Sequence, residues 1–200
     1  SFPTRRSSDL FWAFCWYYPE EENKQTPLNN ALGFYLKAQN RNRLKFCLNV
    51  CNETGCLIRP KDWDAVCSQW IEMFKQPSYL RLDDKPVLIM LSPWNLERDF
   101  GGPEAVRKAW ESFRAKVKDA GLPGVVIVTC TVPDARLNDL KHEGYDILTG
   151  YNYGVGAHLP IEGSQKFQSL VDEHEAIYAK FAKNTPLPYA PAITSGWDRR

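Results

Sequence analysis

The hydrophobic pattern of the chain contains six apolar runs of strand length, and each ends in polar or aromatic residues. They lie at residues 10–18, 45–53, 87–92, 124–131, 146–153 and 189–195. The run at 45–53 is continuous rather than alternating, which is typical of a strand covered on both faces in a parallel sheet. It ends in Asn52 and Glu53. The pattern therefore predicts a buried strand that places a carboxylate at its carboxyl end.

Between these runs, apolar residues recur at the spacing of amphipathic helices. The pattern predicts helices that start at Thr26-Pro27, near Asp62, at Gly102-Pro103, near residue 133 and near residue 164. His174 lies on the apolar stripe of the last helix, so we expect a packed histidine there rather than a ligand. The expected buried stripes are Leu28, Leu32, Tyr35 and Leu36; Trp63, Val66, Cys67, Trp70, Ile71 and Phe74; Val106, Ala109, Trp110, Phe113, Val117 and Ala120; and Phe167, Leu170, Val171, His174, Tyr178 and Phe181.

The order of elements is strand then helix, with strand starts near residues 11, 45, 87, 124, 146 and 189. This alternation predicts an α/β fold with a parallel sheet. A doubly wound sheet usually has a glycine-rich phosphate turn after an early strand, and the sequence has none. An incomplete (β/α)8 TIM-type barrel with about six β/α units explains more of the pattern. In such a barrel the polar residues at the strand ends converge on one face.

Composition narrows the classes of function. A length of 200 residues indicates one domain. With 25 basic and 24 acidic residues, the charge is balanced, so there is no electrostatic reason to expect a nucleic acid partner. No apolar run reaches the length of about 18 residues that a membrane span needs. Aromatic residues make up 13%, with seven Trp and nine Tyr, and such rings either fill a core or stack on the C–H faces of sugars. A carbohydrate partner is therefore expected, and the oligomeric state is left open.

Six cysteines raise the question of metal or disulfide chemistry. Cys15, Cys47, Cys51 and Cys130 lie inside strand-like runs, where cysteine behaves as a small buried apolar residue. The spacings do not match those of zinc sites, so no metal and no cofactor is expected. A disulfide involving Cys56 stays an alternative. The compartment is left open, with a secreted or periplasmic location slightly favoured.

The first ten residues, Ser-Phe-Pro-Thr-Arg-Arg-Ser-Ser-Asp-Leu, resemble a translated sequencing adapter. They join a strand core at Phe11 without a lead-in. A genuine polar arm is the alternative. We expect residues 11–200 to form the catalytic domain, a partial barrel truncated at both ends.

Four segments, in this order, carry a family resemblance: Phe-Trp-Ala-Phe-Cys-Trp-Tyr-Tyr from Phe11, Cys-Asn-Glu from Cys51, Tyr-Leu-Arg-Leu-Asp-Asp-Lys-Pro-Val from Tyr79, and Gly-Trp-Asp-Arg-Arg from Gly196. Together they resemble the glycoside hydrolase family 99-like proteins, which include the WbsX-type glycosyltransferases. The resemblance covers residues 11–200 and implies a (β/α)8 barrel with carbohydrate chemistry. The family's Asn-Glu-x-Trp segment lacks its aromatic residue here, and a further Asn-Glu-Trp segment would lie beyond Arg200.

Hydrolysis of a glycosidic bond uses two carboxyl groups about 5 to 10 Å apart. Glu53 is the first catalytic candidate, and a helix cap or loop ion pair is its alternative role. Asp198 is the second candidate, although it could instead pair with Arg199 or Arg200. The expected substrate-binding residues are Trp16, Tyr18, Asn52, Trp94, Tyr151, Asn152, Tyr153 and Trp197.

These observations favour a glycoside hydrolase that acts on an oligo- or polysaccharide by carboxylate acid/base chemistry. Two alternatives stay open. A WbsX-type glycosyltransferase for surface polysaccharide would need a donor site, and the absence of a Gly-rich or Asp-x-Asp segment counts against it. A non-catalytic carbohydrate-binding barrel would keep the aromatic rim and need no paired carboxylates.

Overall fold

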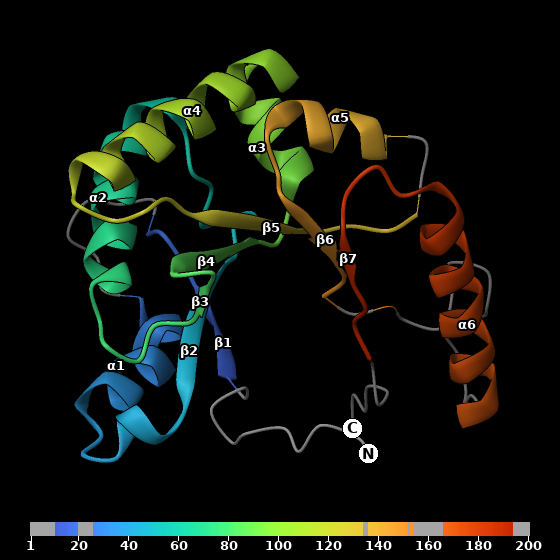
Figure 1. Cartoon of the computed structure of the whole chain (residues 1–200), viewed down its shortest axis with the longest axis horizontal. Helices are drawn as coiled ribbons and strands as arrows, with labels where there is room; N and C mark the ends of the chain where they lie inside the picture. Colours follow the sequence, from blue (N-terminus) through green and yellow to red (C-terminus); the bar gives the residue numbers. More distant parts are fainter. Residues whose placement is uncertain (1–10, 20–25, 134–135, 152, 154–165, 194–200) are drawn as a thin grey trace.

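The computed structural model describes residues 11–19, 26–133, 136–151, 153 and 166–193, and strands alternate with helices along them (Figure 1). The segment at residues 1–10 lies outside this part of the chain. The strands are β1 Phe11–Trp16, β2 Lys45–Val50, β3 Arg81–Leu82, β4 Lys85–Met90, β5 Val126–Cys130, β6 Ile147–Thr149 and β7 Tyr189–Ala190. The α-helices are α1 Asn30–Lys37, α2 Trp63–Phe74, α3 Pro93–Phe100, α4 Pro103–Asp119, α5 Leu137–Glu143 and α6 Phe167–Asn184. Short 3-10 turns lie at Pro27–Asn29, Arg41–Arg43 and Pro60–Asp62.

Six strands form one parallel sheet in the order β1-β2-β4-β5-β6-β7, which is also their order in the sequence. The sheet curves, and β1 and β7 are its two open edges in Figure 1. This arrangement confirms the predicted α/β fold, an incomplete TIM-type barrel with parallel strands adjacent in chain order. The main strands start within about two residues of the predicted positions.

A short antiparallel strand, β3, was not predicted. It pairs with β4 through a two-residue turn at Asp83 and Asp84. Both aspartates have positive φ, 49° and 63°. Positive φ at both central residues is the requirement of the tight turns that join twisted antiparallel strands. The turn therefore makes a small hairpin that leaves the parallel order of the main sheet unchanged.

The core between the sheet and its outer helices is built from aromatic rings. All six residues of the predicted stripe on α2 are buried. Their rings pack against α4, with the Trp63 and Trp110 rings 5.0 Å apart and the Trp70 and Phe113 rings 5.4 Å apart, both edge to face. This confirms the helical pattern for α2, and it shows that Trp63, Trp70 and Trp110 serve packing.

The opposite, inner face of the sheet carries a smaller apolar cluster. Val87, Val126 and Val128 form it, and Ile89 and Ile147 pack against it. Because side chains alternate across a strand, these residues face away from the helices that cover the outer side. The inner face therefore has its own packed layer beneath the carboxyl ends of the strands.

Some helical predictions were wrong at their ends. Leu28 and Phe167 are exposed. Leu28 belongs to a 3-10 turn, which shifts it out of phase with α1, and Phe167 is the first residue of α6. Ala120 is also exposed, because α4 ends at Asp119 and Ala120 is only its cap. Helix α3 was not predicted at all.

The structure also tests the predictions about disulfides and membrane spans. None of the six cysteines forms a disulfide, so the alternative of a disulfide at Cys56 was wrong. Cys47, Cys51 and Cys130 are buried as expected, whereas Cys15 is half-buried. No helix in the described part of the chain is both long and apolar enough to cross a bilayer.

Candidate active site at the carboxyl ends of the strands

Asn52 joins the ends of two neighbouring strands. It lies two residues after the end of β2, and its exposed fraction is 1%. Its amide nitrogen donates to the carbonyl oxygen of Ser92 at 2.8 Å, and its amide oxygen accepts from the Ser92 N–H at 3.2 Å. Ser92 follows β4, so this double contact ties the carboxyl ends of β2 and β4 together. A buried amide with both groups bonded is a rigid support for the residue beside it.

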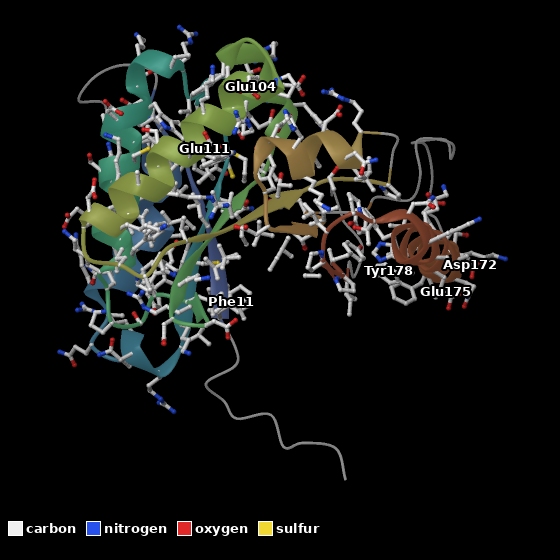
Figure 2. All side chains as sticks on the ribbon, turned by 45° about the horizontal axis from the view of Figure 1, so that its top comes forward. Phe11, Glu104, Glu111, Asp172, Glu175 and Tyr178 are labelled. Carbon is white, nitrogen blue, oxygen red and sulfur yellow. The ribbon has the colours of Figure 1, made fainter. Side chains whose placement is uncertain are left out.

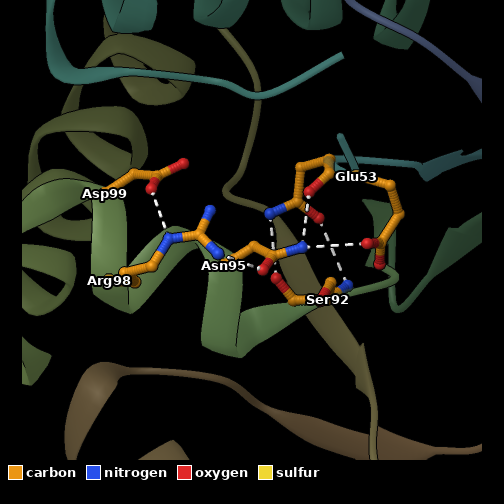
Figure 3. Close-up of polar contacts among 6 residues, drawn as sticks. Glu53, Ser92, Asn95, Arg98 and Asp99 are labelled. Atoms are coloured by element: carbon orange, nitrogen blue, oxygen red, sulfur yellow. Dashed lines mark hydrogen bonds and ion pairs between the residues drawn. The ribbon is translucent and has the colours of Figure 1, made fainter. Parts of the chain in front are cut away.

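Glu53 is that neighbour, and its carboxylate is exposed to solvent. The Asn95 amide donates to Glu53 Oε2 at 3.0 Å and also to the carbonyl oxygen of Asn52 at 3.0 Å. Arg98 in turn donates to the amide oxygen of Asn95 at 3.0 Å, so Asn95 lies between Glu53 and Arg98 (Figure 3). One carboxylate is therefore held at the end of β2 by a side chain from α3.

Helix α3 places these partners. Pro93 occupies its first turn after Ser92, which suits the fixed φ of proline, and Asn95 and Arg98 are one turn apart on the helix. Arg98 also donates to Asp99 at 2.7 Å. This hydrogen bond is the main reason that the pKa of Arg98 is raised, and the charges of Asp99 and Glu53 raise it further. A positive charge therefore lies near Glu53.

The arrangement suits general acid/base chemistry or binding of a sugar hydroxyl. Asn95 orients one oxygen of Glu53, and no hydrogen bond within the described residues occupies the other. The carboxylate is reachable from solvent. Such a group can accept or deliver a proton once a substrate excludes water from it.

Trp94 lies on α3 beside this network and is half-buried. The guanidinium of Arg136 lies 4.4 Å from the centre of its ring. Arg136 also pairs with Glu97 and with Asp139. One face of Trp94 is therefore covered by a cation, and only the other face is left for a sugar ring.

Trp16 and Tyr18 lie next to each other but not on the inner face. Trp16 is 6% exposed and its ring meets that of Trp70 on α2 edge to face at 5.8 Å. Tyr18 packs against Trp16 at 6.2 Å. Alternation along β1 puts Trp16 on the helix side, because Cys15 beside it faces inward. The structure thus places Trp16 beneath the rim, as support, rather than on it.

Tyr151 does lie at the inner face and is more than half exposed. Its hydroxyl is 4.0 Å from Cys15 Sγ. A hydrogen bond with the Cys51 thiol, together with weaker ones to the hydroxyls of Tyr151 and Tyr17, lowers the pKa of Cys15 to about 6, although partial burial opposes the change. Cys15 belongs to β1, where it lies opposite Asn49 of β2, and Cys51 is the first residue after β2. The inner face therefore brings Tyr151 to the Cys15 thiol, beside the end of β2.

Tyr153 is buried against α6 instead of lining a rim. Its hydroxyl is 3.0 Å from that of Tyr189, and its carbonyl oxygen is 3.0 Å from His174 Nε2. His174 is itself buried and also contacts Tyr178, which confirms the expected packed histidine. Burial and the neighbouring Tyr189 hydroxyl raise the pKa of Tyr153 well above its usual value.

Three predicted site residues, Asn152, Trp197 and Asp198, lie outside the described residues. Of the others, the structure brings Asn52, Glu53 and the helix of Trp94 together. Sequence reasoning missed Asn95 and Arg98. Their signal was the Pro93 start of a helix directly after a strand, with polar residues at helical spacing.

Comparison with known proteins supports the fold. No family model matches the chain, and no curated protein matches it. Among solved structures, the GH99 endo-alpha-mannosidase from Bacteroides thetaiotaomicron is similar with a TM-score of 0.54 and 14% identity, over 94% of this chain and 50% of that one. A glycoside hydrolase-like protein is similar with a TM-score of 0.52 and 16% identity, over 84% of this chain and 51% of that one. The chain spans about half the length of these two structures and has a GH99-like fold.

Proposed function

We propose that the chain is a glycoside hydrolase of the GH99-like type, with Glu53 as a catalytic carboxylate and residues 11–200 as part of its catalytic domain. The observation that carries this proposal is the carboxylate held at the end of β2 by Asn95 at 3.0 Å. In barrel enzymes the chemistry lies at the carboxyl ends of the strands. The fold shared with two glycoside hydrolase structures supports the same reading.

In this proposal Glu53 exchanges a proton with the glycosidic oxygen or with an attacking water. Asn95 is a positioning residue, because it fixes one carboxylate oxygen and leaves the other toward solvent. Asn52 holds the loop in place from below. Asp198 stays the candidate for the second carboxyl group, and the aromatic residues Trp94 and Tyr151 are the proposed sugar contacts.

The substrate class follows from the neighbour that is an endo-alpha-mannosidase. We propose an oligo- or polysaccharide, with α-linked manno-oligosaccharides as the first substrates to test. Reducing-end release from these substrates measures turnover. Glu53→Gln keeps the shape of the side chain and removes its charge, so turnover should fall about 100-fold or more, as loss of an acid/base group commonly does.

Glu72→Gln is the matched control, because Glu72 is an exposed glutamate near the C-terminal end of α2, where it pairs with Lys75 rather than with the Glu53 network. It should leave turnover unchanged. Turnover of the Glu53→Gln variant near that of the parent chain would remove Glu53 from the mechanism. If the parent binds the sugar without cleaving it, and Glu53→Gln binds equally well, a non-catalytic carbohydrate-binding barrel is the better description.

Asn95→Ala tests positioning. It leaves Glu53 in place but removes the amide that orients it, so kcat should fall about tenfold while KM changes little. A change in KM alone would mean that Asn95 binds substrate instead.

A further inference from the structure

A depression lies on the outer layer, between α1 and α2, and Tyr17 and Pro19, which follow the carboxyl end of β1, form part of its wall. Its volume is about 290 Å³. Its walls include Asn30, Gly33, Phe34 and Lys37 of α1 and Gln69 of α2. Small-molecule sites usually measure about 300–1,000 Å³. The depression is therefore large enough for one small ring and too small for a long ligand.

The α1 wall is one face of the helix. Asn30, Gly33, Phe34 and Lys37 are spaced as successive turns, and this face is not the one that packs on the sheet, where Leu32 is buried. Phe34 is 72% exposed. At Gly33 no heavy atom lies within 4 Å of the place where a side chain would begin. Open space at Gly33 therefore lies beside the exposed ring of Phe34.

Polar side chains around the Phe34 ring are available to bind a ligand. Within the described residues the side chains of Asn30, Lys37 and Gln69 have no hydrogen bond or ion pair. Asn29 shows the contrast, because its amide accepts from the Tyr17 N–H at 3.0 Å and donates to the Tyr17 carbonyl at 2.9 Å. That double contact fixes the rim of the depression, whereas the amides inside it face solvent.

We propose that this depression is a second carbohydrate-binding site, which takes a single pyranose ring of a polysaccharide. An apolar ring next to several hydrogen-bonding side chains matches a sugar, which has an apolar C–H face and hydroxyls around its edge. Phe34 stacks on the C–H face. The amides of Asn30 and Gln69 donate to and accept from hydroxyls, and Lys37 donates to a hydroxyl or to the carboxylate of a uronic acid. The site is distinct from Glu53, so its test needs no hydrolysis.

Electrophoresis of the 200-residue chain through native gels that contain polysaccharide tests the proposal. The gels carry neutral α-mannan or acidic polygalacturonate, and all variants are made in the Glu53→Gln background so that the gel is not degraded. Phe34→Ala should weaken the retardation about tenfold in apparent Kd. Phe167→Ala, a similarly exposed phenylalanine on α6, should not. Retardation by α-mannan means that Lys37 meets a hydroxyl, and retardation by polygalacturonate alone means that it meets a carboxylate.

Gly33→Leu is the second variant. It fills the open space and replaces a helical glycine, so it should abolish the retardation that depends on Phe34 without lowering the melting temperature. This separates a blocked site from a damaged fold. Retardation by neither polysaccharide, or retardation that both Phe34→Ala and Gly33→Leu leave unchanged, would overturn the proposal.

Discussion

Two regions of the molecule use aromatic rings in opposite ways. Between α2 and α4 the rings of Trp63, Trp70, Trp110 and Phe113 pack against one another, mostly edge to face, and we call this the tryptophan cluster. Around α6 the rings carry hydrogen-bonding groups and use them. There, the Tyr178 hydroxyl donates to the Ala192 carbonyl at 2.6 Å. The first region is held by buried apolar area, and the second by directional contacts.

The second region comprises Tyr153, His174, Tyr178 and Tyr189, and we call it the tyrosine network. Figure 2 shows Tyr178 on the side of α6 that faces the sheet, with Asp172 and Glu175 on the other side. The strands here are short, since β6 has three residues and β7 has two. Short strands offer few main-chain hydrogen bonds. The tyrosine hydroxyls therefore supply the directional contacts that a longer ladder would supply.

The largest expected effect comes from the tryptophan cluster. Trp70 is fully buried among other rings. Trp70→Ala should lower the free energy of unfolding by about 3–5 kcal/mol, because it leaves a cavity that rigid neighbouring rings cannot fill. Urea denaturation followed by circular dichroism measures this. Trp94→Ala is the control, since Trp94 is half-exposed, and its cost should be much smaller. Equal costs would contradict the view that packing holds this region.

Glu143 lies at the edge of the same cluster, and it should make stability depend on pH. It is 0% exposed, and neither carboxylate oxygen has a hydrogen-bond partner within the described residues. Burial, and then the charge of Glu97, raise its pKa from 4.5 to about 8, while Arg136 opposes and Asp139 adds to the rise. The folded protein therefore keeps a proton that the unfolded chain releases.

The sign follows from this difference in bound protons. The stability that a neutral Glu143 permits is fully present below about pH 4.5 and is lost as the pH rises through about 8. Glu143→Gln cannot ionise, so it should flatten this part of the profile and stabilise the protein by about 2–4 kcal/mol at pH 8, since one pKa unit corresponds to about 1.4 kcal/mol. Denaturation midpoints at pH 5 and pH 8 measure it. An equal response at both pH values would exclude Glu143 as the cause.

A smaller effect is expected where the tyrosine network meets the sheet. A Cβ at Gly150 would lie 2.2 Å from the ring of Tyr153. Gly150→Ala should therefore displace this ring, break its contact with Tyr189 and cost about 1–3 kcal/mol. Gly33→Ala is the matched control, because open space surrounds that position in α1, and it should stabilise the chain by about 0.5–1 kcal/mol. If both variants change the free energy of unfolding equally, the position of the Tyr153 ring does not require a glycine at residue 150.

The smallest effect is expected from one hydroxyl. Tyr178→Phe removes the bond to Ala192 and the contact with His174, and it should cost about 1 kcal/mol. Amide hydrogen exchange should rise in α6 while it stays unchanged in α2, because only the tyrosine network is loosened. Tyr151→Phe serves as the control, since within the described residues its hydroxyl makes only a 4.0 Å contact with the Cys15 thiol. Faster exchange throughout the chain would mean that the two regions are not separate.

The contrast also explains which parts of the fold could be predicted. The stripe of α2 could be, because large apolar residues repeat there at helical spacing and all of them are buried. Helix α3 could not, because among its eight residues only Pro93 and Leu96 are buried and the others are largely polar or charged. Periodicity detects helices that bury a broad face. It fails for a short helix that presents polar groups to a site.

The candidate site shows the same limit. Glu53 could be predicted as a candidate because it ends the continuous apolar run at 45–53, which indicates a buried strand. Its partner Asn95 lies 42 residues further along the chain, and only the pairing of β2 with β4 brings the two together. Trp16 was expected at the rim because an unbroken run of apolar residues does not reveal which of them face inward. The alternation within β1 turns it toward α2 instead.

The order of the strands has a consequence for how the protein is made. Each main strand from β1 to β7 has as its next neighbour the main strand that follows it in the chain. A ribosome extends a chain at about 5–20 residues per second, from the N-terminus. Every new strand therefore emerges beside a neighbour that already exists, and the sheet can grow at one edge, one β/α unit at a time. The arrangement in space repeats the order of synthesis, so no strand has to be inserted between two others that are already paired.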